Sequence, residues 1–401
     1  MNILFFYNSS LDPITGGIGR VSTVLAKYFD SKGNNTFFLS RINTTKNNND
    51  RQDYLVDQEK YFTDKNCEFL KSYLLKNKID IIINQSGMSN IASQFIFQAK
   101  ELDIPIISVI HNTLIGSIKN FSSAYYDRFS KLNLQFLLKY TDSKYIKKII
   151  LFLYKLKYRE HYQELVNKSD KVVLLSNSFV SELEFFVGDG YREKIAAISN
   201  PISFDVDNCS IDINKKEKEI LYVGVVNFSQ KRVDLLIEIW NNLCDDYSDW
   251  KLRIVGGGPG LCEAKNLANE LNLKNIFFEG FQDPKSYYEN ASIFCMTSSF
   301  EGFGIVLVEA MQYGVVPVAF NSFASVTDII DSETSGLLIP TFDIEKYKNK
   351  LRKLIENEEY RYKLANNALD KSSEFSIKKI GDQWLNLFKS LGSLTNVVKS
   401  K

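Results

Sequence analysis

The sequence predicts an α/β protein made of two doubly wound domains. Its 401 residues are more than one compact domain usually holds, so two domains of roughly 200 residues each are expected. Short apolar runs that suit buried strands alternate with stretches that suit helices in both halves of the chain. Such alternation predicts parallel sheets covered by helices, and Gly-rich turns after several of the strands are typical of nucleotide-binding α/β folds.

Composition and charge exclude several classes of function. The 49 basic and 48 acidic residues leave a net charge of +1, so no nucleic-acid partner is expected. The five cysteines lack metal-type spacing and the chain has two histidines, so no metal ion or other cofactor is expected. The N-terminus lacks the features of a signal peptide, and the apolar run 149–154 is too short to span a bilayer. We expect a cytoplasmic protein, either soluble or peripheral on the inner face of the cytoplasmic membrane.

The first half of the chain has the pattern of a βα series. Gly16 and Gly17 lie in the turn between the first strand and its helix, which is mononucleotide-binding geometry. The G-x-G-x-x-G spacing is missing, so a dinucleotide fingerprint is not supported. A polar linker is predicted at 204–217. The predicted strands are 2–7, 35–39, 80–84, 104–110, 168–175 and 194–199. The predicted helices include 63–77, a helix that begins at 91 and another helix that ends at 186.

The least generic part of this half is residues 116–159. Its second part, 139–159, carries seven Lys or Arg residues against one Asp, interleaved with apolar residues. A basic amphipathic segment of this kind can lie on an anionic membrane. Lys147, Lys148 and Lys155 would then contact the lipid or an acceptor substrate held at the membrane. The alternative is a packed helical hairpin whose lysines are solvated. The sequence leaves both interpretations open.

The second half has the same pattern. A polar segment that includes Lys231 and Arg232 follows its first strand. Ser376 is the expected cap of a last helix, and residues 392–401 are expected to fray. The predicted strands are 219–224, 251–255, 275–279, 293–296 and 314–318, and the predicted helices include 233–243 and 343–356.

The stretch 298–317 carries the clearest sign of a site. A buried strand is followed by the turn Glu301-Gly302-Phe303-Gly304 and then by a helix that starts at Ile305 and Val306. Glycines let backbone N–H groups approach a ligand, and a helix N-terminus favours an anion. Carboxylates at both ends, Glu301 and Glu309, suit a nucleotide sugar, because each accepts hydrogen bonds from hydroxyls. The plainer alternative is that Glu301 caps the helix and Glu309 is a solvated helix residue.

This stretch resembles the E-x7-E region of family 4 retaining glycosyltransferases. The family pattern of Glu-Gly-Phe-Gly, a Glu-Ala-Met helix and a Pro-Val strand is present in that order. The resemblance implies the GT-B fold, in which two Rossmann-like domains face a central cleft. It further implies an acceptor-binding domain at 1–204, a nucleotide-sugar-binding domain at 205–375 and a C-terminal helix, 376–401, that crosses back to the first domain.

The same resemblance implies the reaction. A sugar would pass from a nucleotide donor, a UDP-sugar, to a hydroxyl of a saccharide or lipid-linked saccharide acceptor, with retention of configuration. Bacterial surface polysaccharide synthesis is the expected context. In such a route the acceptor hydroxyl would attack the sugar from the same face that the phosphate leaves, and the leaving phosphate would help to deprotonate the acceptor.

Family roles carry over onto matching residues. The resemblance implies that Lys231 and Glu301 serve catalysis and that His111, which follows the 104–110 strand, hydrogen-bonds a donor-sugar hydroxyl. One departure is clear, because the family Arg after the first strand of the second half falls on Val225, or on Val226 in a shifted register. The implied donor-binding residues are Gly16, Gly17, Arg232, Phe281, Gly302, Phe303, Gly304, Ile305, Val306 and Glu309.

Two alternatives to a transferase stay open. Val225 motivates a non-catalytic GT-B partner subunit that binds a nucleotide sugar or an acceptor, because a cation is missing from the phosphate site. A sugar-nucleotide epimerase on the same fold would need acid and base groups at the sugar carbon, and the two histidines argue against it.

Overall fold

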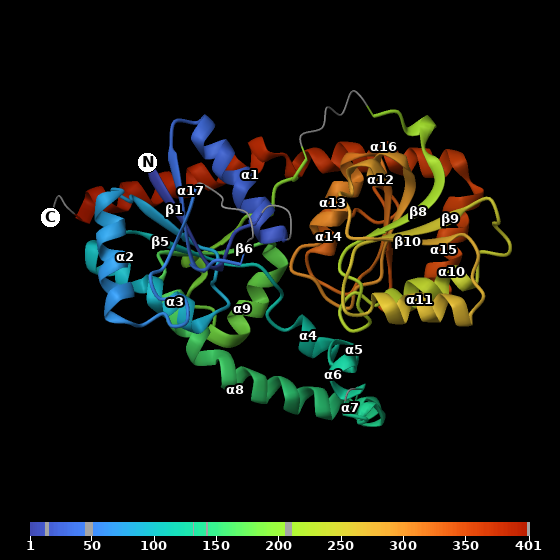
Figure 1. The fold of residues 1–401 in the computed structure, drawn as a ribbon, viewed down its shortest axis with the longest axis horizontal. Coiled ribbons are helices and arrows are strands. Elements are labelled where there is room, and N and C mark those ends of the chain that lie inside the picture. Colours follow the sequence, from blue (N-terminus) through green and yellow to red (C-terminus); the bar gives the residue numbers. More distant parts are fainter. Residues whose placement is uncertain (13–15, 45–50, 131, 142, 205–210, 399–401) are drawn as a thin grey trace. The chain divides into compact units, whose positions relative to one another are not determined.

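The computed structural model describes residues 1–12, 16–44, 51–130, 132–141, 143–204 and 211–398, and the chain divides into two compact units (Figure 1). The first unit comprises residues 1–112, 154–203 and 375–401. The second unit comprises residues 113–153 and 204–374. Each unit is built around its own parallel sheet, as the sequence predicted.

The sheet of the first unit has seven parallel strands in the order β3-β2-β1-β4-β5-β6-β7. Its central strands are apolar on both faces, and β4 and β5 are buried throughout, because helices cover both sides. The strands are β1 (Asn2–Ser9), β2 (Asn35–Ile42), β3 (Gln52–Tyr54), β4 (Ile81–Asn84), β5 (Ile106–Ile110), β6 (Lys171–Leu174) and β7 (Ile195–Ala197).

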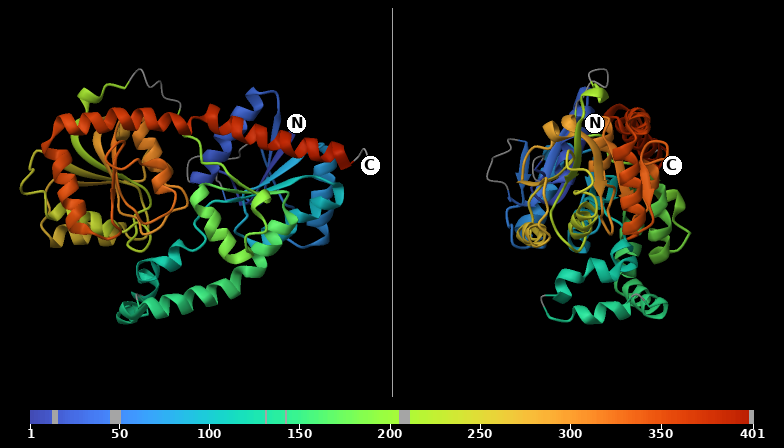
Figure 2. Two further views of the ribbon diagram at one scale, coloured as in Figure 1. Left: turned by 180° about the vertical axis from the view of Figure 1, so that it is seen from behind. Right: turned by 90° about the vertical axis from the view of Figure 1, so that its right-hand side faces the viewer.

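Helices cover the first sheet in two groups, because crossovers are right-handed and the strand order runs in both directions from β1. One face carries α1 and α17, which pack side by side through an edge-to-face contact between Phe29 and Phe388 (Figure 2). The helices of this unit are α1 (Gly17–Ser31), α2 (Asp64–Lys76), α3 (Asn90–Ile96), α9 (Val180–Val187), α17 (Ile377–Val398) and the second part of α8 (Lys144–Lys168).

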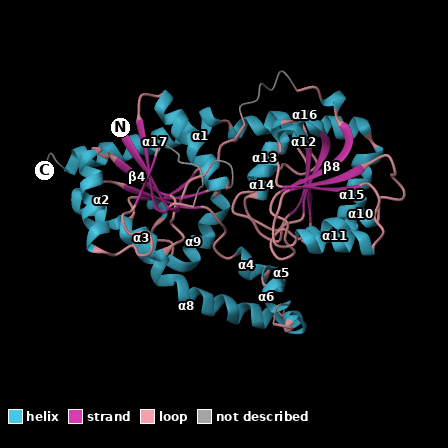
Figure 3. Ribbon diagram, in the orientation of Figure 1, coloured by secondary structure: helices cyan, strands magenta, loops and turns pink. Residues whose placement is uncertain are grey.

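The sheet of the second unit has six parallel strands in the order β10-β9-β8-β11-β12-β13. Figure 3 shows its strands between two layers of helices. The strands are β8 (Glu217–Val223), β9 (Lys251–Val255), β10 (Ile276–Gly280), β11 (Ala291–Met296), β12 (Val316–Phe320) and β13 (Leu337–Ile339). The helices are α10 (Val233–Asn241), α11 (Leu261–Glu270), α12 (Lys285–Asn290), α13 (Ile305–Gln312), α14 (Val326–Ile329), α15 (Ile344–Glu356) and α16 (Glu358–Ser372).

The second unit also contains residues 113–153, which we call the arm. Its short helices are α4 (Gly116–Lys119), α5 (Phe121–Ala124), α6 (Tyr126–Ser130) and α7 (Leu138–Thr141), and they lead into α8. The sequence placed these residues with the N-terminal half, and that boundary differs from the structure. The reason is local: Asn120 Nδ2 donates to Ser299 O over 2.5 Å, and Ser123 Oγ donates to Ser229 O over 3.1 Å.

Other sequence expectations differ in smaller ways. The strand β3 was missed because three residues are too few for a periodic pattern. Residues 392–398 were expected to fray, but α17 continues to Val398, two turns beyond Leu391, its last described buried residue. The expected cap is present at Ser376, whose Oγ accepts from Lys379 N over 3.4 Å. Asp343, where a helix was predicted to start, caps α15, since its Oδ1 accepts from Lys346 N over 2.9 Å.

The strand orders locate the sites. In each sheet the chain leaves the first strand in one direction and later continues from its other side, so β1 and β4 are neighbours in one sheet and β8 and β11 in the other. The loops after such a pair diverge and leave a crevice at the carboxyl ends of the strands, where open α/β sheets bind their ligands.

Candidate active site

Two loops meet at the switch point of the second sheet: residues 224–232 after β8 and residues 297–304 after β11. Thr297 Oγ1 donates to Lys231 O over 3.1 Å and to Arg232 O over 2.9 Å. Ser299 N donates to Gln230 O over 2.7 Å. Because these bonds tie the 297–304 loop to the backbone of residues 230–232, the side chains that the loops carry are held at fixed separations.

Lys231 and Glu301 form an ion pair between these loops. Lys231 Nζ lies 2.6 Å from Glu301 Oε1, with the two side chains 18% and 9% exposed. Asn227 Oδ1 accepts from Lys231 N over 2.8 Å and positions the lysine. Glu301 does not cap the helix that follows, because the N-cap of α13 is Gly304, so the capping alternative is wrong. The arrangement places an ammonium group and a carboxylate together in the loops at the carboxyl ends of β8 and β11.

The N-terminus of α13 lies in the same loop. Gly304 has φ +86°, and a Cβ there would lie 3.3 Å from Leu307 and Phe323 side-chain atoms, so this position favours glycine. Ser325 Oγ donates to Phe303 O over 3.2 Å and fixes the turn. The first N–H groups of a helix have no intrahelical acceptor, and those of Ile305 and its neighbour Val306 suit an anion.

The predicted residues at this turn differ in how they can take part. Ile305 and Val306 are half-buried, whereas the Phe303 side chain is 3% exposed and packs inside. Only the backbone of Phe303 is therefore available to a ligand. Contact of Gly302, Phe303, Gly304, Ile305 and Val306 with a donor remains a prediction.

Glu309 is a fully buried carboxylate on α13. Its exposed fraction is 0%, and Tyr288 Oη donates to Glu309 Oε2 over 3.2 Å. The ring of Tyr288 stacks on Tyr313 at a centroid distance of 5.8 Å. The solvated-helix alternative is therefore wrong. A buried carboxylate is costly unless it is hydrogen-bonded, so its presence calls for polar partners. The ribose role remains a prediction.

Arg232 lies beside Lys231 in sequence but is paired differently. Its Nη2 is 2.7 Å from Asp234 Oδ2, its Nη1 donates to Ser123 Oγ over 3.1 Å, and its guanidinium lies 5.4 Å from the centroid of the Phe342 ring. The backbone of Arg232 is left-handed, with φ +50°. Donor binding by Arg232 stays a prediction, and the guanidinium already has a carboxylate partner.

The missing family cation falls on an exposed position. Val225 is 50% exposed, whereas Val226 is fully buried, so Val225 is the position from which a side chain could reach a ligand. The Gly-rich turn after β9 packs against this loop: a Cβ at Gly256 would lie 1.9 Å from Gly224 O. The glycines therefore serve close backbone packing. Phe281, after β10, is 63% exposed, and its contact with the base remains a prediction.

The first unit carries the remaining predicted residues at its own switch point. Gly16 is the N-cap of α1 with φ −153°, an extended conformation open to any residue. Among the described residues, no atom lies within 4 Å of a Cβ built at Gly16 or Gly17, whereas one at Gly19 would lie 2.1 Å from Asp12 O. The fold therefore requires glycine at 19 but not at 16 or 17, which leaves room for a ligand at those two positions.

His111 follows β5 at the same edge of that sheet. Its Nε2 is hydrogen-bonded to Gln85 Oε1, and Gln85 Nε2 donates to Ser22 Oγ of α1 over 3.0 Å. Burial lowers the pKa of His111 from 6.5 to about 4. The imidazole is therefore neutral at pH 7, which suits hydrogen bonding to a sugar hydroxyl. Gln85, the partner that orients the ring, was not predicted from the sequence.

The architecture defines the class of protein. Solved structures with similar folds include a sucrose-phosphate synthase from Thermosynechococcus elongatus, 18% identical, with a TM-score of 0.73 over 98% of this chain and 99% of that one. The apo lipopolysaccharide outer core galactosyltransferase WaaB is 18% identical, with a TM-score of 0.67 over 97% and 99%. Anabaena HepE in complex with UDP and glucose is 16% identical, with a TM-score of 0.68 over 97% and 100%. The chain has the GT-B fold.

Sequence comparison finds similarity to glycosyltransferases. Residues 205–371 match the family model described as Glycosyl transferases group 1. A Haemophilus influenzae protein described as an uncharacterized glycosyltransferase is 32% identical over 225 residues, 55% of this chain and 61% of the relative. A Campylobacter jejuni N-acetyl-D-galactosaminyltransferase is 28% identical over 201 residues, 49% of this chain and 55% of the relative. The matches thus span little more than half the length of these curated relatives.

Proposed function

We propose that the protein is a retaining glycosyltransferase that moves a sugar from a nucleotide donor, a UDP-sugar, to a hydroxyl of a saccharide or lipid-linked saccharide. The observation that carries the proposal is the Lys231–Glu301 pair beside the N-terminus of α13 at the switch point. The names of the relatives support the class, and that of the Campylobacter jejuni enzyme includes an undecaprenol-linked saccharide. Bacterial surface polysaccharide synthesis is the proposed context.

Each charged group has a role in this reaction. The ammonium of Lys231 and the N–H groups that open α13 stabilise the charge that develops on the departing diphosphate. Glu301 accepts hydrogen bonds from donor-sugar hydroxyls, and Glu309 accepts them from the ribose. Donor binding by His111, Gly16 and Gly17 is also part of the proposal. We propose that these residues act without a resident metal ion.

A donor screen tests the proposal. The full chain is incubated with individual nucleotide sugars and a mixed saccharide acceptor pool, release of nucleoside diphosphate is followed, and binding is measured by calorimetry. We expect release from one UDP-sugar and its loss in Glu301→Ala, while Glu263→Ala on α11 retains it. If no nucleotide sugar binds or is consumed, the transferase proposal is wrong.

One observation favours a second candidate function. The exposed Val225 leaves the phosphate site without the family cation, which suits a non-catalytic partner subunit. The same screen separates the two, because a partner subunit binds a nucleotide sugar or acceptor without releasing diphosphate. Conversion of the nucleotide sugar into an isomer in the absence of any acceptor would instead indicate an epimerase.

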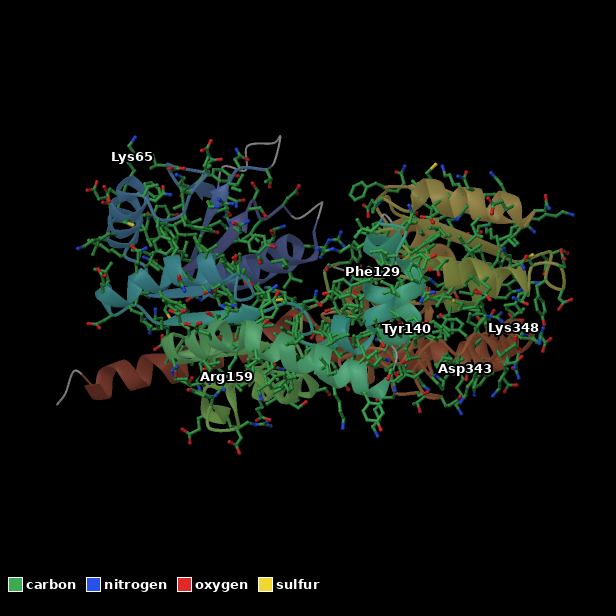
Figure 4. All side chains as sticks on the ribbon, turned by 90° about the horizontal axis from the view of Figure 1, so that it is seen from below. Lys65, Phe129, Tyr140, Arg159, Asp343 and Lys348 are labelled. Carbon is green, nitrogen blue, oxygen red and sulfur yellow. The ribbon has the colours of Figure 1, made fainter. Side chains whose placement is uncertain are left out.

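We further propose that the arm and α8 meet an anionic membrane surface. Large apolar side chains recur at helical spacing along one face of α8, and Tyr145, Ile149, Phe152, Leu153 and Leu156 are between 57% and 79% exposed. Figure 4 shows side chains of α7 and α8 as sticks, with Tyr140 of α7 and Arg159 of α8 labelled. A packed hairpin would bury these side chains, so their exposure supports an interaction surface over the hairpin alternative. Patches of this kind mark interaction surfaces.

The charges on α8 suit acidic lipid headgroups. Lys148 is exposed next to the apolar face, while Lys147 is half-buried and Lys155 lies over the Phe185 ring at 4.9 Å. Each lysine near an anionic surface contributes about 1 kcal/mol. No helix in the described part of the chain is long and apolar enough to cross a bilayer. Binding would therefore be interfacial.

Vesicle binding tests the membrane proposal. The double variant Phe152→Ser/Leu156→Ser is expected to lose most of its binding to vesicles that contain phosphatidylglycerol, measured by sedimentation. The control is Val56→Ser/Phe62→Ser, which changes two similarly exposed apolar residues away from the arm, 59% and 49% exposed. Replacing Lys147, Lys148 and Lys155 by Ser is expected to reduce binding and its salt dependence. Equal binding by wild type and the α8 variants would rule out this surface.

A further inference from the structure

A cavity lies within the second unit, between the arm and the elements around the start of α10 and α15. Its volume is about 510 Å³, within the range of roughly 300–1,000 Å³ typical of small-molecule sites. Arg232 is the one lining residue that is also a predicted donor-binding residue, and the other lining residues have no role in the proposed donor site. Its lining residues include Ser123, Tyr126, Asn133, Phe136, Phe228, Arg232, Asp234 and Phe342.

The polar part of the cavity wall is formed by Arg232 and Asp234, which make an ion pair with each other. Both Nε and Nη2 of Arg232 donate to Asp234, and Nη1 donates to Ser123 of the arm. The two charged side chains are 20% and 23% exposed, so they keep surface toward the cavity. An Arg–Asp pair of this kind has no net charge, yet it offers both hydrogen-bond donors and hydrogen-bond acceptors. A hydroxyl group can bond to both, because it donates and accepts.

The remaining wall is largely aromatic and apolar. The ring of Phe342 lies under the Arg232 guanidinium, and Phe136 of the arm is 59% exposed. Apolar walls with a few polar groups are the usual composition of a small-molecule site. An aromatic ring also covers the C–H face of a sugar, while the hydroxyls at its rim remain free for hydrogen bonds.

The backbone around the cavity is unusual. Eight non-glycine residues in the described part of the chain have positive φ, and three of them line this cavity: Asn133 at +53°, Arg232 at +50° and Phe342 at +63°. The conformation is ordinary for Asn but costly for a bulky residue such as Phe. Residues held in this way tend to lie where a side chain must be aimed at a ligand.

We propose that this cavity binds a short neutral saccharide, of disaccharide or trisaccharide size. Phosphate is disfavoured because Asp234 already neutralises the one cation among the named lining residues and would repel an anion. A hydrocarbon chain is disfavoured because it would take the ion pair out of water without new hydrogen bonds. A neutral polyol avoids both costs. The assignment of this saccharide as the acceptor rests on the proposed transferase function, whereas the binding itself does not.

The cavity abuts the proposed catalytic loop. Arg232 follows Lys231 directly, and Ser123 of the arm donates to Ser229 of the same loop over 3.1 Å. A saccharide that contacts Arg232 and Ser123 would therefore touch the segment that carries the catalytic lysine. This contiguity is the physical basis for assigning the saccharide as an acceptor and not as an unrelated ligand.

Saccharide titration without any donor tests the site. A panel of disaccharides of hexoses and N-acetylhexosamines is titrated at millimolar concentration into the full chain, with saturation-transfer NMR as the readout. We expect one or more to bind wild type and to bind about tenfold more weakly to Asp234→Asn and to Phe136→Ala, because each loses a contact to the ligand. Leu137→Ala is the matched control, because Leu137 is the next residue in the arm, is 37% exposed and is not part of the cavity wall.

The outcomes are separable. Thermal melts of each variant show whether it is folded, and Phe136→Ala changes an exposed side chain, so it keeps the test informative if Asp234→Asn unfolds. Absence of binding across the panel, or equal affinity in wild type and a folded cavity variant, overturns the proposal. Saccharide binding that depends on the cavity, in a protein that consumes no nucleotide sugar, would retain the site and reject the transferase function.

Discussion

Replacement of Lys231 by alanine is expected to lower kcat with the UDP-sugar donor by about 10²–10³-fold, with a smaller change in KM. The ammonium lies 2.6 Å from Glu301 beside the start of α13, where the diphosphate charge would develop. Val225 already leaves this site without one family cation, so Lys231 carries more of the stabilisation. Steady-state kinetics of nucleoside diphosphate release measure the effect.

A second measurement separates catalysis from support of the fold. Lys231→Ala leaves the nearly buried Glu301 carboxylate without its cation, which by itself is destabilising. If Lys231 merely neutralises Glu301, Lys231→Ala should lower the melting temperature while the folded protein keeps its kcat. If Lys231 stabilises the leaving group, kcat falls even in a variant that thermal melts show to be folded. Lys265→Ala, an exposed change on α11, is the control and is expected to retain wild-type kcat.

Glu309→Gln is expected to weaken binding of the UDP-sugar by about tenfold or more, because hydrogen bonds to a charged acceptor contribute about 1.5–3 kcal/mol each. The amide keeps the size of the side chain, so the fully buried site is not emptied. Calorimetry with the UDP-sugar and with UDP measures the loss, and both ligands should be affected alike because they share the ribose.

Tyr288→Phe is the matched variant for this result. It removes the hydroxyl that donates to Glu309 over 3.2 Å and leaves the carboxylate in place. A ribose role predicts that donor affinity falls in Glu309→Gln and stays near wild type in Tyr288→Phe. Equal losses in both variants would show that Glu309 acts through the tyrosine. An unchanged affinity in Glu309→Gln would show that the ribose role is wrong.

Local features of the chain could be predicted from the sequence alone. The apolar runs that became β1, β8 and β11 are continuous in sequence, which is the pattern of strands covered on both faces, and the turn at Gly304 follows from local backbone chemistry. The position of Glu301 after a strand and before a helix therefore needed no tertiary information. The two-sheet α/β class followed from the same alternation.

Tertiary structure decided which side chains meet. Glu301 and Lys231 are 70 residues apart, and they pair because β11 lies beside β8, a strand order that hydrophobic periodicity does not encode. The participation of Thr297, Ser299 and Asn227, which join or order the two loops, was not predicted for the same reason. Their residue types are common in turns, and no local signal separates them from ordinary loop residues.

Burial was also decided by packing. Helical spacing placed Glu309 on the predicted helix that became α13. It did not indicate that Tyr288 of α12 donates a hydrogen bond to Glu309 or that Glu309 is fully buried. The apolar residues of α8 had the spacing of a packed helix, yet they are exposed because no other element covers that face in the described part of the chain. The sequence determines which faces of a helix are apolar or charged. The segments that pack against the helix determine whether each face becomes core, site or interface, because burial is a property of contacts between distant segments.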